Sequence, residues 1–212
     1  MKDPMMVMDN LLAVSVWADL RRGVDQLSLL TSIGARVGLE SILFAEDGPL
    51  APTSADAARL GEEFGSPLPV VRRSWRSGES PTSADHLPAW AGRDLFAAVA
   101  GRQYRSVDVA VSVGRTDAEA KARAAGDPLF QDLAGDLDDA LVGRLEDVQE
   151  KVARLAAGGI RQLCCILPQG DLVDHLAQLS SIAVGTLETH YPGSPRSADP
   201  LPPAGWGGPA QS

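Results

Sequence analysis

The chain has 212 residues, and its 28 acidic and 19 basic residues give a net charge of -9. This length favours a single domain, and an acidic chain without clusters of lysine and arginine is a poor ligand for nucleic acid. No apolar run approaches the roughly 18 residues of a membrane helix, and the first twenty residues are too often interrupted by polar side chains for a signal peptide. We therefore expect a cytoplasmic protein that binds neither nucleic acid nor membranes.

The first segment with clear periodicity combines a strand and a helix. Residues 11–17 form a short apolar run, and residues 26–36 follow with apolar side chains at helical spacing. Residues 37–44 are rich in β-branched and apolar side chains, which predicts a second strand that ends at an acidic turn. The helical positions are Leu27, Leu30 and Ile33.

The middle of the chain has weaker signals. Residues 54–64 predict a helix, which is broken by two prolines before a short predicted helix at 70–75. Residues 77–88 are expected to form a loop, followed by a brief strand around Trp90 and a helix at 94–101.

The second half shows the most consistent local pattern. A strand is predicted at 107–113, a helix at 116–125, a helix at 146–157 and a strand at 160–167. Thr116 with Glu119 forms a capping box, and Asp171 is a cap for the last helix. One face of the helix at 146–157 carries Leu145, Val148, Val152 and Leu155. Strands that alternate with amphipathic helices predict an α/β fold with a mainly parallel sheet.

Several segments resemble the luciferase-like monooxygenase family and occur in the order found there. SVDVAVSVGRTDAEAKARAAG and LVGRLEDVQEKVARLAAGGIRQLCCILPQGD are similar to the carboxyl-terminal end of that family's domain. Earlier segments with a resemblance are SVWAD at 15–19, DQLSLL at 25–30 with ARVGL at 35–39, VRRSWRSGE at 71–79 and PAWAGR at 88–93.

The resemblance implies a TIM-type (β/α) barrel that uses reduced FMN or F420 on a small organic substrate, as a homodimer. Between about residues 47 and 88 the family would supply further strands that are not evident here, so we expect an incomplete or contracted barrel. The barrel domain is placed at 1–191, and the Pro- and Gly-rich residues 192–212 are expected to be a disordered tail.

In such barrels, ligands bind where the strands end, which selects the cofactor-binding candidates. Those residues are Trp17, Asp19, Phe44, Glu46, Gly92, Arg93, Gly143 and Arg144. The two glycines allow phosphate to approach the backbone, and the arginines next to them supply positive charge. The alternatives are ordinary turns between strand and helix for the glycines and core packing for the aromatic residues.

Catalytic residues are not assigned, because the family strand often ends in Asp-His where this chain has Asp19 followed by Leu20. His86 in the predicted loop, His175 and His190 are expected on the solvated surface. The alternative function is therefore a non-catalytic relative that binds flavin or a partner.

The two cysteines, Cys164 and Cys165, are adjacent on a predicted strand and should point to opposite faces. Core packing is expected for both, with neither a disulfide nor a metal site.

Overall fold

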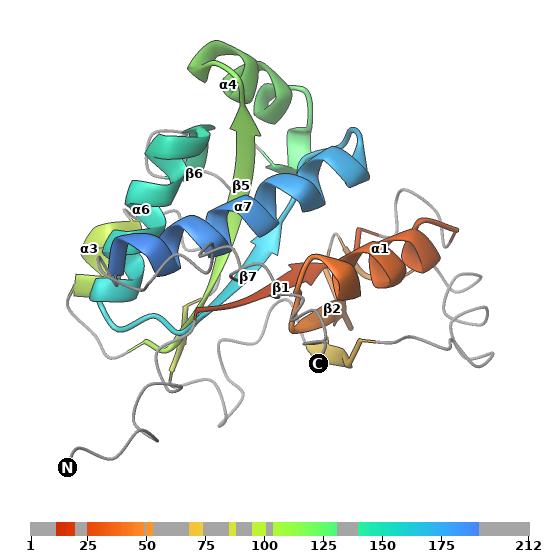
Figure 1. Ribbon diagram of the computed structural model, residues 1–212. Helices are drawn as coiled ribbons and strands as arrows, with labels where there is room; N and C mark the ends of the chain where they lie inside the picture. Colours follow the sequence, from red (N-terminus) through yellow and green to blue (C-terminus); the bar gives the residue numbers. More distant parts are fainter. Residues whose placement is uncertain are drawn as a thin grey trace, which may run out of the picture.

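The computed structural model describes residues 12–19, 25–48, 50–52, 68–73, 85–87, 95–100, 104–130 and 140–190. Within these ranges the protein is an α/β structure with a seven-stranded sheet and five helices (Figure 1). The strands are β1 (Ala13–Trp17), β2 (Ser41–Ala45), β3 (Val70–Arg73), β4 (His86–Leu87), β5 (Ser106–Gly114), β6 (Leu141–Arg144) and β7 (Gln162–Ile166). The helices are α1 (Asp25–Arg36), α3 (Leu95–Ala100), α4 (Asp117–Ala125), α6 (Leu145–Ala157) and α7 (Leu172–His190).

The strand order is β3-β2-β1-β7-β5-β4, with β6 paired to the second half of β5, and each of these pairs is parallel. The last strand, β7, lies beside the first, β1, which is the neighbour relationship of a TIM-type barrel. No pairing joins β3 to β4 among the described residues. The predicted α/β fold with parallel strands is confirmed, as an open sheet consistent with part of a TIM-type barrel.

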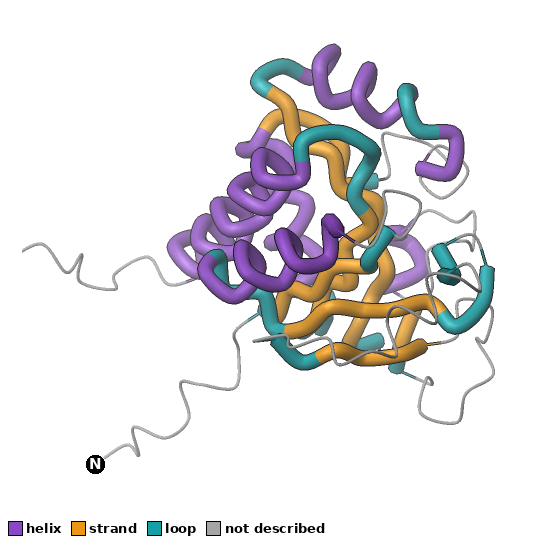
Figure 2. The backbone as a smooth tube through the Cα atoms, turned by 90° about the vertical axis from the view of Figure 1, so that its right-hand side faces the viewer, coloured by secondary structure: helices purple, strands orange, loops and turns teal. Residues whose placement is uncertain are grey.

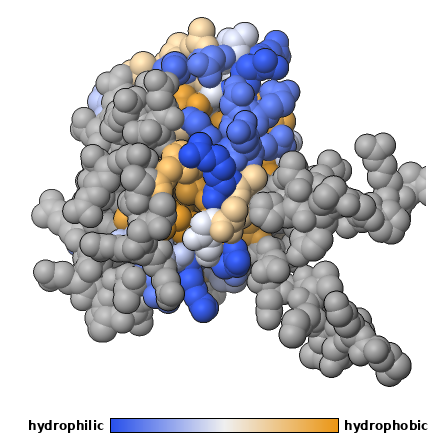
Figure 3. All heavy atoms as spheres, turned by 90° about the vertical axis from the view of Figure 1, so that its left-hand side faces the viewer, coloured by the Kyte–Doolittle hydropathy of each residue, from blue (hydrophilic) through white to orange (hydrophobic). Residues whose placement is uncertain are grey.

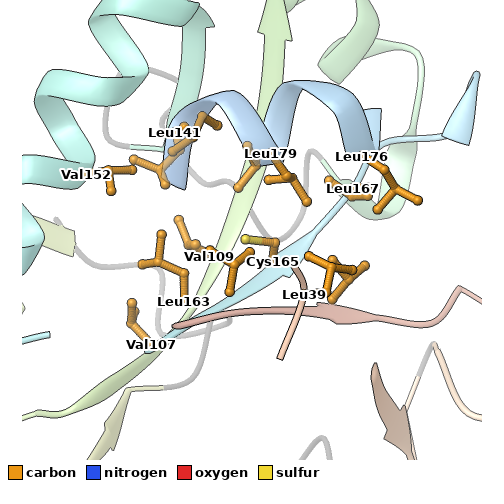
Figure 4. Packing of buried hydrophobic residues seen from close by; sticks show 14 of the residues in the cluster. Leu39, Val107, Val109, Leu141, Val152, Leu163, Cys165, Leu167, Leu176 and Leu179 are labelled. Atoms are coloured by element: carbon orange, nitrogen blue, oxygen red, sulfur yellow. The ribbon is translucent and has the colours of Figure 1, made fainter. Parts of the chain in front are cut away.

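The larger hydrophobic core lies between the sheet and its helices. Helices gather mainly on one side of the strands, as Figure 2 shows from the side. Val109 of β5 and Cys165 of β7 point toward Val152 of α6 and toward Leu176 and Leu179 of α7 (Figure 4). The predicted apolar face of α6 is confirmed, because Val148, Val152 and Leu155 are fully buried and Leu145 packs partly buried against them.

The outer surface over this helical layer is mixed. In Figure 3, which faces the left-hand side of Figure 1, hydrophilic residues border hydrophobic ones on the described surface. Within the described residues, no helix is both long and apolar enough to cross a membrane.

Both predicted helix caps are present. Thr116 Oγ1 accepts a hydrogen bond from the Glu119 backbone N–H at 3.2 Å, and the Glu119 carboxylate accepts one from Arg115 N–H at 2.9 Å. Asp171 Oδ1 accepts hydrogen bonds from the backbone N–H groups of Val173 and Asp174 at 2.9 and 3.3 Å. These local contacts satisfy N–H groups that have no partner within the helix.

Two predictions for the middle of the chain are wrong. Residues 70–73 form strand β3 instead of a helix, because Val70 and Val71 are β-branched and pair with Ile42 and Leu43 of β2. The predicted loop at 77–88 contains strand β4, which pairs with the start of β5. Both errors concern short strands whose pairing partners are distant in sequence.

The second predicted strand is shorter than expected at its start. Gly38 has a φ of 81° and lies in a turn, so that β2 begins only at Ser41. The helix at 54–64, the strand around Trp90 and the tail at 192–212 lie outside the described residues.

Candidate functional site

The face of the sheet turned away from α6 and α7, here called the inner face, carries polar side chains near its centre. Because side chains alternate along a strand, β5 directs Val107 and Val109 to the helices and Asp108 and Ala110 to the inner face. The two cysteines divide in the same way: Cys165 belongs to the helix-facing core and Cys164 to the inner-face core, as predicted.

A polar row crosses four neighbouring strands of the inner face. In the register of the sheet, Asp108 pairs with Cys164, Cys164 with Ser15, and Ser15 with Ser41. All four side chains are buried. The Ser15 and Ser41 hydroxyl groups lie 2.8 Å apart, and Gln162 Nε2 donates to Ser15 Oγ at 3.0 Å. Ser15, Ser41 and Gln162 thus satisfy hydrogen bonds with one another, as buried polar groups must.

Asp108 is held by two aromatic side chains from other strands. Trp17 Nε1 donates a hydrogen bond to Asp108 Oδ1 at 2.8 Å, and His86 Nε2 lies 3.2 Å from Asp108 Oδ2. His86 Nδ1 is also 2.8 Å from Ser106 Oγ. The Asp108 side chain is 1 % exposed and that of His86 17 %, so the imidazole is the part of this pair that solvent reaches.

Cys164 lies near His86 and Asp108 and also contacts the guanidinium group of Arg73. Arg73 Nη1 donates a long hydrogen bond to Cys164 Sγ at 3.7 Å. Burial raises the pKa of the Cys164 thiol from 9.0 to about 12, and the negative charge of Asp108 adds to the increase, while Arg73 opposes it. Burial raises the pKa of Cys165 as well, with smaller contributions from Cys164 and Asp108. Both thiols are therefore protonated at neutral pH and are weak nucleophiles.

We refer to Trp17, Arg73, His86, Asp108 and Cys164 as the inner-face cluster; they come from β1, β3, β4, β5 and β7. An imidazole and a carboxylate at hydrogen-bonding distance can hold and transfer a proton. One donor atom each from His86, Asp108 and Cys164 lies within 4.8 Å of the others, a spacing that also suits a metal ion.

The predicted site residues of the first two strands, β1 and β2, do not come together in one place. Trp17 belongs to the inner-face cluster, whereas Phe44 packs in the helix-facing core, which is the alternative stated for an aromatic residue at this place. Asp19 is partly buried just beyond β1, and Glu46 is exposed just beyond β2, where its backbone N–H donates to Arg73 O at 2.9 Å.

The predicted site residues at 143 and 144 end strand β6 before α6 begins. Gly143 has a φ of 149°, and a Cβ atom there would lie 3.1 Å from Asp117 Oδ1. Arg144 is exposed, forms the N-cap of α6 without a side-chain cap, and lies 3.4 Å from Glu146. Gly92 and Arg93 lie outside the described residues.

Most of the inner-face cluster was missed by the sequence reasoning. His86 was expected in a solvated loop, but it lies on β4 and contacts Asp108 and Ser106 because β4 pairs with β5. His175 was also expected at the surface, but it is 3 % exposed, beside Gly170. The one available signal was Asp108, a single carboxylate within the apolar strand VDVAVSV.

Comparisons with known proteins leave the family open. No protein-family model matches the chain, and no curated protein matches it either. The resemblance to the luciferase-like family therefore stays a prediction, based on the quoted sequence segments.

Proposed function

We propose that this protein is a contracted luciferase-like oxidoreductase that binds reduced FMN or F420 where its parallel strands end, and acts on a small organic substrate. One observation carries the proposal. The resembling segments include β1, β5, β6 and β7, which are consecutive neighbours in one parallel sheet, and most of β3 at one end of that sheet. Because parallel strands end at one edge of a sheet, here called the carboxyl edge, the segments meet where α/β proteins bind ligands.

The residues at the carboxyl edge are compatible with an anionic cofactor. Arg144 is exposed and precedes the 13-residue helix α6, whose N-cap makes no side-chain hydrogen bond. Backbone N–H groups and the helix dipole at such a terminus favour a phosphate group, although Glu146 and Asp147 in the first turn oppose it. In this proposal Arg144 binds the phosphate of the cofactor.

The chain's own contribution is to position the cofactor and to exclude water. A reduced flavin or deazaflavin supplies the hydride or the electrons when it is bound. Trp17, the last residue of β1, is held by its hydrogen bond to Asp108, and in this proposal it lies beneath the bound cofactor.

Titration of the purified full chain with FMN, and separately with F420, tests this proposal through cofactor fluorescence and visible absorbance. We expect saturable binding of one of the two, weakened about tenfold by Arg144→Ala through loss of a charge-assisted contact. Arg36→Ala is the control, because Arg36 is exposed in the last turn of α1, which leads back to the opposite edge of the sheet. The proposal is wrong if neither cofactor binds at millimolar concentration.

The alternative is a non-catalytic relative that binds flavin or a partner subunit. It is favoured by the open arrangement of β3 and β4, which are not paired with each other within the described ranges. An unpaired sheet edge is a surface on which a second chain can add. This alternative would be favoured if the protein binds the reduced cofactor but oxidises it with none of the acceptors offered. A measurement of molecular mass in solution would test the expected homodimer.

A further inference from the structure

We propose that His86, Asp108 and Cys164 form a binding site for a divalent transition metal, with Zn²⁺ as the preferred ion. One donor atom from each side chain lies within 4.8 Å of the other two, on the inner face of three adjacent strands. This inference does not depend on the proposed cofactor, because the three ligands lie within the sheet and not at its carboxyl edge.

The distances are close to those of a tetrahedral site. Zinc binds imidazole nitrogen and carboxylate oxygen at about 2.0 to 2.1 Å, which places two such ligands about 3.3 Å apart. His86 Nε2 and Asp108 Oδ2 are 3.2 Å apart. Asp108 and Cys164 are register partners on neighbouring strands, and Cys164 Sγ lies within 4.8 Å of the other two donor atoms.

The chemistry of the donor set selects the ion. One nitrogen, one oxygen and one sulfur ligand suit Zn²⁺, which accepts all three, whereas Mg²⁺ and Ca²⁺ require oxygen ligands. A dication balanced by one carboxylate and one thiolate is neutral, and the ion holds the sulfur in its thiolate form. Three protein ligands leave the fourth tetrahedral position for water or a solute, which is the arrangement of catalytic zinc sites.

Hydrogen bonds from neighbouring residues already orient two of the three proposed ligands, His86 and Asp108. Ser106 Oγ lies 2.8 Å from His86 Nδ1, and in the tautomer in which Nδ1 donates to Ser106 the lone pair of Nε2 is available to the ion. Trp17 Nε1 occupies Asp108 Oδ1 and leaves Oδ2 for the ion. Metal-binding histidines and carboxylates are regularly supported in this way.

Arg73 fits the same interpretation. Its Nη1 lies 3.7 Å from Cys164 Sγ, and its positive charge balances that of the buried Asp108 carboxylate. A bound dication would take over that role from Arg73, a partly buried residue at the end of β3. Entry of the ion is on the side of His86, whose side chain is 17 % exposed, against 1 % for Asp108.

The test is a titration of the untagged full chain, freed of metal with a chelator, with Co²⁺ followed by competition with Zn²⁺. We expect one equivalent of Co²⁺ to produce the near-ultraviolet charge-transfer band of a cobalt–thiolate bond and the visible bands of a tetrahedral ion, both removed by Zn²⁺. Cys164→Ser should abolish the charge-transfer band and weaken Zn²⁺ binding about 100-fold or more, since loss of supporting residues alone costs 10- to 100-fold.

The chain contains a matched control. Cys165 is the next residue on the same strand, is equally buried, and points to the opposite face, so Cys165→Ser should keep the band and the affinity. Circular dichroism verifies that each variant is folded. Should Cys164→Ser fail to fold, His86→Gln changes the most accessible ligand and should remove the tetrahedral visible bands.

Two results would overturn the inference. One is a wild-type chain that binds neither Co²⁺ nor Zn²⁺ under these conditions. The other is a charge-transfer band that survives Cys164→Ser, or visible bands unchanged by His86→Gln, in folded protein.

Discussion

Trp17 Nε1 donates a hydrogen bond of 2.8 Å to Asp108 Oδ1, linking residues that are 91 positions apart. β7 lies between the two strands that carry them, so the indole crosses over the Cys164 side of the sheet to reach the carboxylate. Both side chains are buried, and this contact ties the first strand to the centre of the inner face.

Trp17→Phe should lower the free energy of unfolding by about 2 to 4 kcal/mol, because it leaves the buried Asp108 Oδ1 without its donor and opens a small cavity. Urea denaturation followed by circular dichroism measures this change. A double-mutant cycle with Asp108→Asn should give a coupling energy of about 1 kcal/mol or more. Strict additivity of the two substitutions would contradict a direct interaction.

Leu155→Ala in α6 should lower the free energy of unfolding by about 2 to 5 kcal/mol, since Leu155 is fully buried between α6 and the sheet. Leu29→Ala is the matched control: it is the same substitution in a helix, at a residue that is 40 % exposed. We expect a cost of less than about 1 kcal/mol for the control. Equal costs in urea denaturation would show that α6 does not pack as described.

Gly143→Ala should be destabilising by about 1 to 3 kcal/mol, because a φ of 149° is strained for any residue with a Cβ atom and Asp117 Oδ1 would lie only 3.1 Å away. Gly126→Ala tests the same change at the end of α4, where φ is -74°. A Cβ atom there would lie 3.4 Å from the nearest backbone oxygen. Thermal unfolding should therefore show a clearly lower Tm for Gly143→Ala than for Gly126→Ala.

Alkaline pH should destabilise the metal-free protein through its buried thiols. The pKa of Cys164 is raised from 9.0 in the unfolded chain to about 12 in the folded one, so its contribution to stability is complete below pH 9. It is lost as the pH rises from 9 toward 12, because the unfolded thiol ionises first. The free energy of unfolding, measured by urea denaturation across this range, should fall less steeply for Cys164→Ala than for wild type, and identical slopes would contradict this assignment.

Local features could be predicted because their causes lie within one turn of helix or one strand. The apolar spacing of α6, the caps Thr116 and Asp171 and the opposite directions of Cys164 and Cys165 depend only on helix and strand periodicity. Of the eight residues predicted to bind a cofactor, Trp17 joins the inner-face cluster, because its position along β1 directs it to the inner face. Phe44 lies in the other core, because its position along β2 directs it to the helices.

The sequence by itself therefore determined the α/β class, the parallel strands and the helices α4, α6 and α7 of this protein. These features follow from the spacing of apolar residues within each segment and do not depend on contacts with distant segments. Only the tertiary structure decided that residues 70–73 and 86–87 are strands, because each is too short to be stable without the neighbour with which it pairs. The tertiary structure also determined which residues meet in the inner-face cluster. His86, Asp108 and Cys164 meet through the register of three strands, and a register depends on hydrogen bonds between segments far apart in the chain, which no local pattern encodes.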